Sequence, residues 1–180
     1  MYNIVQRLSA VGAFTLSVFF VLLGAVAVFT PFQATSPTAQ VSLRNTKLLH
    51  GRYGDRYSDY YYNPSAEYAF VKFDLEADLS SLFRWNTKQL FVYVVAEYES
   101  SKHGVNQIVL WDRIIRSPED AKFQLRGYKN KYAFIDVNPR FEKGQVGNIS
   151  VHWNVIPHVG FMLNYQGENR TQFDFVPKFV

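Results

Sequence analysis

The pattern of hydrophobic and polar positions divides the chain into two unlike parts. No charged residue occurs between Leu8 and Leu43, whereas nearly every Lys, Arg, Asp and Glu lies in the rest of the chain. Residues 10–32 form an uncharged, predominantly apolar run. At about 1.5 Å per residue, a helix of this length crosses a hydrocarbon core of about 30 Å. Because lipid cannot satisfy backbone hydrogen bonds, this run predicts a transmembrane helix at 10–32, preceded by a short cytosolic tail at 1–9.

The same segment also fits a cleaved signal peptide. In that alternative Arg7 is the charged n-region, residues 8–23 are the apolar core, and Ala25-Val26-Ala27 is the small-residue cleavage site. Apolar cores of signal peptides usually span about 7–15 residues, and here the run continues past Ala27 to Phe32. The length therefore favours an uncleaved anchor, and secretion after cleavage stays as the alternative.

Small residues form a stripe along the predicted helix. The stripe consists of Ala10, Ala13, Ser17 and Gly24, at spacings of three, four and seven. Small residues on one face allow a second transmembrane helix to approach closely, but they are also common in such helices generally. The stripe thus indicates either a helix-packing face or ordinary composition.

After a polar linker that contains Pro31 and Pro37, the apolar period changes to two. Strict alternation at 71–79 and 149–155 predicts half-buried strands, and the continuous apolar run 90–96 is typical of a strand covered on both faces. We also expect one helical turn that begins near Asp78. Further strands are predicted at 41–49, 107–115, 131–137 and 172–176. Short strands rich in β-branched and aromatic residues predict a mainly β protein, with an antiparallel β-sandwich at 33–180.

Charge and cysteine content narrow the possible functions. The 180-residue chain has a net charge of +4, but its basic residues are spread singly along the sequence. No run neutralises several phosphates, so nucleic acid is not a predicted partner. The Tyr-rich segment 52–64 resembles a nucleic-acid surface in composition, yet a surface loop is the simpler interpretation. The absence of cysteine excludes disulfides and thiol chemistry.

Two acceptor sequons bear on the orientation of the chain. Asn148-Ile149-Ser150 and Asn169-Arg170-Thr171 both fit the Asn-x-Ser/Thr pattern of glycosylation. They are meaningful only if the large domain lies in the secretory lumen, whereas the positive charges on the two sides of the helix decide nothing. We therefore predict glycosylation at Asn148 and Asn169, and a lumenal C-terminal domain.

No residue pattern indicates catalysis or metal binding. Asp74, Glu76 and Asp78 project from one face of a predicted strand, as metal ligands or simply as its solvated face. The histidines, which are His50, His103, His152 and His158, are scattered, and no G-x-S-x-G or S-x-x-K sequence frames a serine. We predict no cofactor, no metal and no enzymatic activity, while a lumenal enzyme built on these carboxylates is the competing hypothesis.

Four blocks resemble one known family in order along the chain. Residues 75–98 (LEADLSSLFRWNTKQLFVYVVAEY) are similar to the most distinctive stretch of subunit 3 of the eukaryotic signal peptidase complex. Residues 106–114, 131–136 and 151–160 are similar to further blocks of the same family, and the N-terminal helix with its short tail also matches. The resemblance covers essentially the whole chain.

The resemblance implies a single-pass type II protein of the endoplasmic reticulum membrane. Members of this family are non-catalytic subunits that support a separate serine-protease subunit in cleaving signal peptides from nascent secretory proteins. The implied partners are that catalytic subunit, the other small membrane subunits and the lipid bilayer. The family's glycosylation sequon falls on the block that contains Asn148, while Asn169 has no matched family position.

The contact with the catalytic subunit is predicted at five residues of the matched blocks. These are Trp85, Asn86, Lys88, Trp111 and Asp112. Both tryptophans equally fit a place in the core. The alternative function is a secreted or membrane-anchored β-sandwich binding module unrelated to proteolysis.

Overall fold

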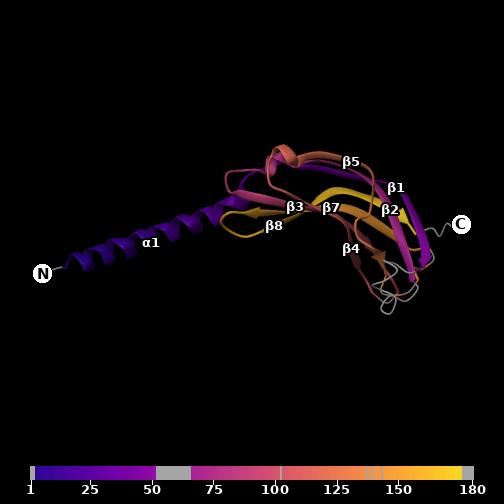
Figure 1. Ribbon diagram of the computed structural model, residues 1–180, viewed down its shortest axis with the longest axis horizontal. Helices are drawn as coiled ribbons and strands as arrows, with labels where there is room; N and C mark the ends of the chain where they lie inside the picture. Colours follow the sequence, from indigo (N-terminus) through magenta and orange to yellow (C-terminus); the bar gives the residue numbers. More distant parts are fainter. Residues whose placement is uncertain are drawn as a thin grey trace, which may run out of the picture.

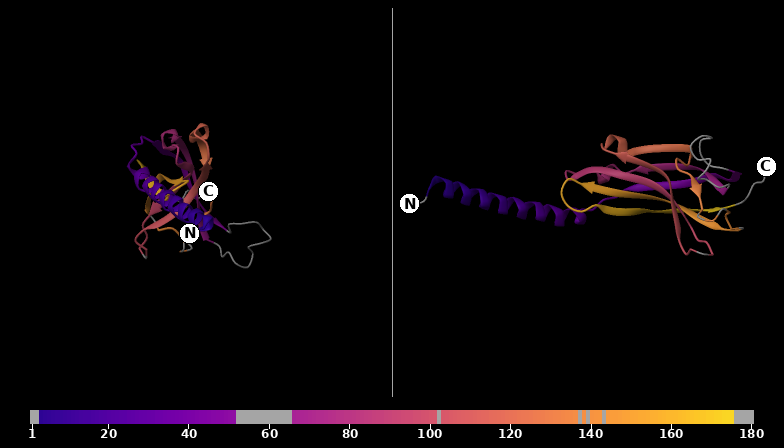
Figure 2. Two further views of the ribbon diagram at one scale, coloured as in Figure 1. Left: turned by 90° about the vertical axis from the view of Figure 1, so that its left-hand side faces the viewer. Right: turned by 60° about the horizontal axis from the view of Figure 1, so that its bottom comes forward.

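The computed structural model describes residues 3–51, 66–101, 103–136, 138, 140–142 and 144–175. Helix α1 (Ile4–Phe29) and the short 3₁₀ turn η1 (Thr30–Phe32) project from one end of a β-sandwich (Figure 1). The right-hand view of Figure 2 shows the helix leaving the same end of the sandwich. The Tyr-rich segment 52–64 lies outside the described residues.

Helix α1 begins six residues before the predicted Ala10. Its side chains are mostly apolar and none of them is buried, and the segment Ile4–Phe32 is long and apolar enough to cross a membrane. That residues 10–32 are the part of this segment embedded in the membrane stays a prediction. The stripe of small residues is likewise exposed on the helix; it consists of Ala10, Ala13, Ser17 and Gly24.

The domain consists of two antiparallel sheets. One sheet has the order β1 (Thr38–Gly51), β2 (Ala66–Asp78) and β5 (Lys122–Lys129), and the two-residue strand β6 (Phe134–Ile135) also pairs with β2. The other has the order β4 (Asn106–Ile115), β3 (Thr87–Tyr98), β7 (Val146–Pro157) and β8 (Leu163–Asp174). The 3₁₀ turns η2 (Ser80–Leu82) and η3 (Glu119–Ala121) connect the sheets at the helix end of the domain. The predicted mainly β sandwich is confirmed.

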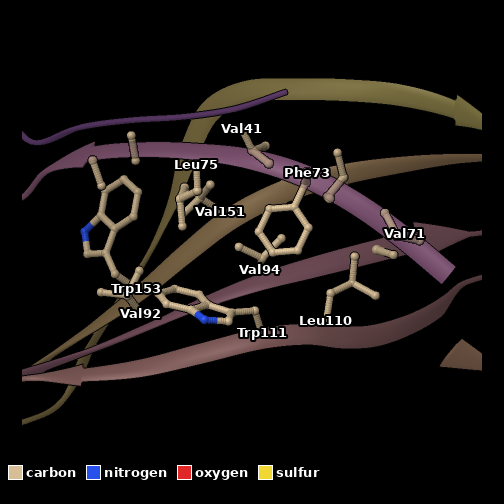
Figure 3. Packing of buried hydrophobic residues seen from close by; sticks show 14 of the residues in the cluster. Val41, Val71, Phe73, Leu75, Val92, Val94, Leu110, Trp111, Val151 and Trp153 are labelled. Carbon is tan, nitrogen blue, oxygen red and sulfur yellow. The ribbon is translucent and has the colours of Figure 1, made fainter. Parts of the chain in front are cut away.

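The core lies between the sheets and follows the predicted alternation. In β2, Val71, Phe73 and Leu75 face inward and are completely buried. Val92 and Val94 of β3, Val151 of β7 and Trp153 of β7 meet them from the other sheet (Figure 3). Burial of such side chains contributes about 1.5–3 kcal/mol each, so this layer supplies the main driving force for folding.

One side of the sandwich is closed by a contact between the sheets. The Thr171 hydroxyl of β8 donates a 2.7 Å hydrogen bond to the Val41 carbonyl oxygen of β1. The edges of the two sheets therefore lie against each other, which protects the inner faces from water.

A β-bulge in β4 buries two consecutive residues. Val94 of β3 pairs with Trp111, but Val95 pairs with Val109, so Leu110 is an extra residue in β4. Both Leu110 and Trp111 are buried as a result. A strand of strict period two would have sent one of them to solvent.

Three strand predictions needed correction. The predicted strand 131–137 is described only to residue 136 and is mostly a loop there: within 131–136 only 134–135 pairs with β2, and the Asn130 amide holds a turn by donating to the Tyr132 carbonyl oxygen at 2.6 Å. The sequence pattern does not predict strand β5. Its alternation of apolar and polar residues is interrupted at Gly127, which adopts a positive φ of 58°. Strand β8 begins at Leu163, well before the predicted position 172. The turn predicted near Asp78 is confirmed as η2, and the Asp78 carboxylate accepts the Ser80 N–H at 3.2 Å.

Candidate interaction sites

The helix and the sandwich are joined at the side chain of Asn86. Its amide nitrogen donates to the Thr30 hydroxyl and to the Val159 carbonyl oxygen, both at 2.8 Å. Its amide oxygen accepts the Val159 N–H at 3.0 Å. One side chain therefore links the end of the helix, the loop before β3 and the loop between β7 and β8.

Burial makes this link costly to break. Asn86 is only 3% exposed, and a buried amide that loses its partners costs about 1–3 kcal/mol per unsatisfied group. Its backbone carbonyl also accepts the His158 N–H at 2.8 Å. These bonds fix the loop 157–162 against the segment that precedes β3.

The loop 157–162 also packs directly on the helix. Gly160 has a φ of 114°, which favours glycine, and a Cβ built there would lie 3.2 Å from the Ala27 Cα. A larger residue would therefore push the loop away from the helix. A second polar contact, from the Arg84 guanidinium to the Gln33 side-chain oxygen at 3.1 Å, supports the same orientation. We call this set of contacts the helix–domain junction.

The structure does not bring the five predicted interface residues together. Asn86 belongs to the helix–domain junction, while Trp85 beside it and Lys88 are exposed near the same end of the domain. Trp111 lies in the core, which is the alternative left open by the sequence. Asp112 is elsewhere on β4, where its carboxylate accepts from the Lys131 ammonium at 2.7 Å. Their role at a partner surface stays a prediction.

Sequence reasoning missed the partners of Asn86. Thr30 is 56 positions from Asn86 in the sequence, and Val159 is 73 positions from it. Gly160 lies on the same distant loop as Val159, so no local sequence pattern pairs these residues with Asn86. Pro157 and Gly160 do mark a turn, but turn chemistry does not say what the turn touches.

An apolar outer face distinguishes the sheet β4-β3-β7-β8. The side chains of Phe91 and Tyr93 on β3 stack with ring centroids 5.3 Å apart, and Tyr93 stacks on His152 of β7 at the same distance. Next to them, Val95 is almost fully buried although it points away from the core cluster, and Ile114 on the edge strand β4 is 49% exposed. We call Phe91, Tyr93, Val95, Val109 and Ile114 the outer apolar face.

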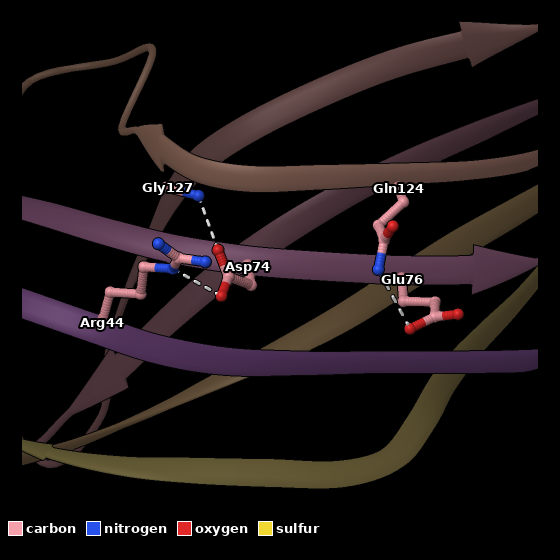
Figure 4. A network of polar contacts seen from close by, with 5 residues as sticks. All are labelled: Arg44, Asp74, Glu76, Gln124 and Gly127. Atoms are coloured by element: carbon pink, nitrogen blue, oxygen red, sulfur yellow. Dashed lines mark hydrogen bonds and ion pairs between the residues drawn. The ribbon is translucent and has the colours of Figure 1, made fainter.

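The outer face of the other sheet carries the predicted row of carboxylates. The Asp74 carboxylate accepts from the Arg44 guanidinium at 2.6 Å and from the Gly127 N–H at 2.5 Å (Figure 4). These hydrogen bonds, with Arg44 first, hold the pKa of Asp74 below its usual range. Glu76 meets the Gln124 amide at 3.4 Å instead of joining Asp74 in one cluster (Figure 4). The row therefore functions as a set of surface polar pairs.

A serine and a histidine lie in contact on β7. The Ser150 hydroxyl is 3.0 Å from the His152 Nε2, a distance that also suits a nucleophile and its base. However, Ser150 has no exposed surface, so a substrate carbonyl has no access to its hydroxyl. Burial lowers the pKa of the His152 imidazole, and the neighbouring Glu97 carboxylate opposes this shift only in part. The pair therefore stabilises the sheet.

Both predicted acceptor asparagines are exposed. Asn148 lies on β7 opposite Glu97, toward the end of the domain remote from the helix. Asn169 lies on β8. Each has room for a glycan, and glycosylation at both stays a prediction.

These features define a class of protein. A helix of transmembrane length is joined rigidly to a β-sandwich that carries an apolar outer face, and the described residues contain no converging group of three or more His, Asp or Glu side chains. A helix of this length and an exposed apolar sheet face are typical of domains that are anchored in a membrane and associate with other proteins.

Comparison with known proteins identifies the family. The family profile described as "Signal peptidase subunit" matches residues 1–178. Proteins named Signal peptidase complex subunit 3 are 34% identical in Caenorhabditis briggsae, 32% in Gallus gallus and 35% in Debaryomyces hansenii. Each alignment covers 97% of this chain and 94% of the relative. The chain therefore belongs to the signal peptidase subunit family, as the resemblance of its four blocks predicts.

The helix–domain junction depends on Asn86, and its removal should loosen the helix. We expect Asn86→Ala to destabilise the junction by about 2–4 kcal/mol, because the Val159 backbone groups lose their partners in a buried site. The chain lacks cysteine, so nitroxides attached at Leu16→Cys and Glu119→Cys report the helix–domain distance by pulsed electron paramagnetic resonance. The distance distribution should broaden in the Asn86→Ala background. The exposed Asn164→Ala is the matched control, and equally narrow distributions in both variants would contradict the role of Asn86.

The His152 site predicts a pH dependence of stability. Because its pKa is lowered in the folded protein, the unfolded chain binds more protons, and stability falls as the pH drops below about 6.5. The slope is at most about 1.4 kcal/mol per pH unit for one proton. Thermal unfolding of the full chain in detergent between pH 8 and pH 5 should show a smaller loss in His152→Gln than in the wild type. The exposed His103→Gln is the control and should behave as the wild type does; an unchanged pH profile in His152→Gln would refute the assignment.

Proposed function

We propose that this chain is a non-catalytic subunit of the signal peptidase complex in the endoplasmic reticulum membrane. The observation that carries the proposal is the family match from residue 1 to residue 178, which includes both the apolar helix and the sandwich. In this role the subunit holds a separate serine-protease subunit in position as it removes signal peptides from nascent secretory proteins.

The helix–domain junction supports an uncleaved anchor. Ala27, the last residue of the small-residue triplet, lies within α1 and packs against Gly160. A protease needs an extended backbone at the scissile bond, and the folded junction keeps this segment helical. In the secreted form of the alternative function, Asn86 would still bind Thr30, but Thr30 would no longer be joined to a membrane helix.

The outer apolar face is the proposed contact surface for the catalytic subunit. The apolar run 90–96 has the composition of a strand covered on both faces, but within the chain only the even-numbered side chains from Leu90 to Ala96 meet the core. The opposite side carries Phe91 and Tyr93, which are partly exposed, and Val95, which is already buried between its neighbours. Contiguous apolar and aromatic surface with few charges is typical of a protein interface.

Of the five predicted interface residues, Asp112 fits this surface best. It pairs across the sheet with Tyr93, and its carboxylate accepts from Lys131 and Tyr132, so it borders the outer apolar face. Anchoring in the same membrane raises the effective concentration of the two subunits to roughly the millimolar range, so the contact itself need not be strong. A rigid helix–domain junction adds orientation to that proximity.

The proposed topology places the sandwich in the lumen. A type II arrangement, with the tail 1–9 in the cytosol, exposes both sequons to the glycosylation machinery. The exposed positions of Asn148 and Asn169 support this topology without deciding which sequon is used.

Substitution on the outer apolar face should release the partner. Ile114→Glu would bury an uncompensated carboxylate at the interface, which costs several kcal/mol, so we expect at least about a tenfold loss of catalytic subunit co-purified in mild detergent. Leu49→Glu is the matched control, because Leu49 is a similarly exposed aliphatic residue on β1 of the other sheet. If wild-type chain purifies alone, the proposed membership of the complex is refuted. If Ile114→Glu and the wild type recover equal amounts of partner, only this choice of surface is wrong.

Glycosylation tests the topology. In microsomes, the wild-type chain should show an electrophoretic mobility shift that endoglycosidase H removes. Asn148→Gln and Asn169→Gln should each remove the part of the shift that the glycan at that site causes, and the double variant should show no shift. Sequencing the N-terminus of the same material should find the first segment still attached. A new N-terminus after Ala27 would instead support the secreted module.

A further inference from the structure

Large apolar side chains gather at the end of the domain from which the helix leaves. Phe161 is 81% exposed, Phe32 is 80% exposed and Trp85 is 69% exposed, and Met162 is exposed as well. We call these four residues the collar. They come from three separate segments that the helix–domain junction brings together, since Asn86 beside Trp85 is bonded both to Thr30 and to Val159.

The collar lies at the depth of the apolar helix. About 20 apolar residues cross a hydrocarbon core, and 20 positions counted from Leu8, just after the charge of Arg7, end at Ala27. The loop residue Gly160 packs on that same Ala27. The loop 157–162 therefore reaches the level of Ala27, about 20 apolar residues from Leu8, where hydrocarbon meets headgroups.

The segments that carry the collar contain almost no charge. The segments 30–37, 79–86 and 157–162 contain one charged residue, Arg84, and no acidic residue. The carboxylates at this end of the domain belong to other segments: Asp78 ends β2, and Glu119 and Asp120 lie in η3. Segments without carboxylates but with exposed aromatics fit a surface that meets lipid headgroups, where Trp and other amphipathic side chains are enriched.

We propose that the collar inserts into the headgroup region of the lumenal leaflet and forms a second membrane contact besides the helix. The helix alone would let the sandwich tilt, whereas two contacts that surround the junction fix the angle between the sheets and the bilayer. The occupant is lipid and not a protein, because the collar is continuous with the transmembrane helix and lies at the boundary that the helix length defines.

Depth measurements on single-cysteine variants test the collar. The proposal rests on the proposed membrane anchoring, so the full chain is reconstituted in phosphatidylcholine nanodiscs that contain lipid with a nitroxide near the headgroup end of the acyl chain. A bimane label at Phe161→Cys or Met162→Cys should be quenched at least about threefold more than one at Val105→Cys, an exposed apolar position in the loop before β4. A label at Leu16→Cys, measured with lipid that carries the nitroxide near the methyl end of the acyl chain, reports the helix itself, because Leu16 lies near the middle of the run from Leu8 to Ala27.

The outcomes separate the two proposals. Quenching at Leu16 and at the collar supports both. Quenching at Leu16 with collar labels that behave like Val105 overturns the collar and leaves the anchor intact. No quenching at Leu16 overturns the anchor and the collar together. The same labels in the purified complex give a further test: if lipid reaches Phe161 in the chain alone but not in the complex, a protein covers the collar and the proposal is overturned.

Discussion

The orientation of this protein depends on one buried amide. The Asn86 side chain satisfies its own hydrogen-bonding groups only by holding Thr30 and Val159 at once. In a buried site the alternative is unpaired polar groups, so the end of the helix cannot move away from the loop between β7 and β8 without a substantial cost. A transmembrane helix followed by a polar linker would otherwise leave the domain free to rotate on its tether.

Rigid attachment makes the surfaces of the domain directional. With the helix held at this junction, each sheet takes a defined angle to the helix axis, and so does the outer apolar face that contains Tyr93 and Ile114. A subunit that positions an enzyme needs this property more than it needs affinity, because tethering in one membrane already supplies a high local concentration. The proposed collar at Phe161 would strengthen the same constraint from the lipid side.

The polar groups of the domain serve its architecture. Asp74 is occupied by Arg44 and the Gly127 N–H, and the Ser150 hydroxyl is enclosed beside His152. Each arrangement lowers the cost of placing a polar side chain on a strand, and the Ser150 hydroxyl has no exposed surface. The family and the relatives that the chain matches are named as subunits of signal peptidase or of its complex.

The sequence by itself determined the features that repeat at short range. The uncharged run after Arg7 predicts the helix, and the period-two alternation around Phe73 and Trp153 predicts the strands and their buried faces, because both patterns are local consequences of backbone geometry. The matched blocks likewise identify the family without coordinates. Only the tertiary structure decided the contacts between distant segments. It places Asn86 and Gly160 at the helix, buries Leu110 and Trp111 through a bulge, and leaves Trp85 exposed, since each depends on how segments far apart in sequence meet, and no periodicity encodes that meeting.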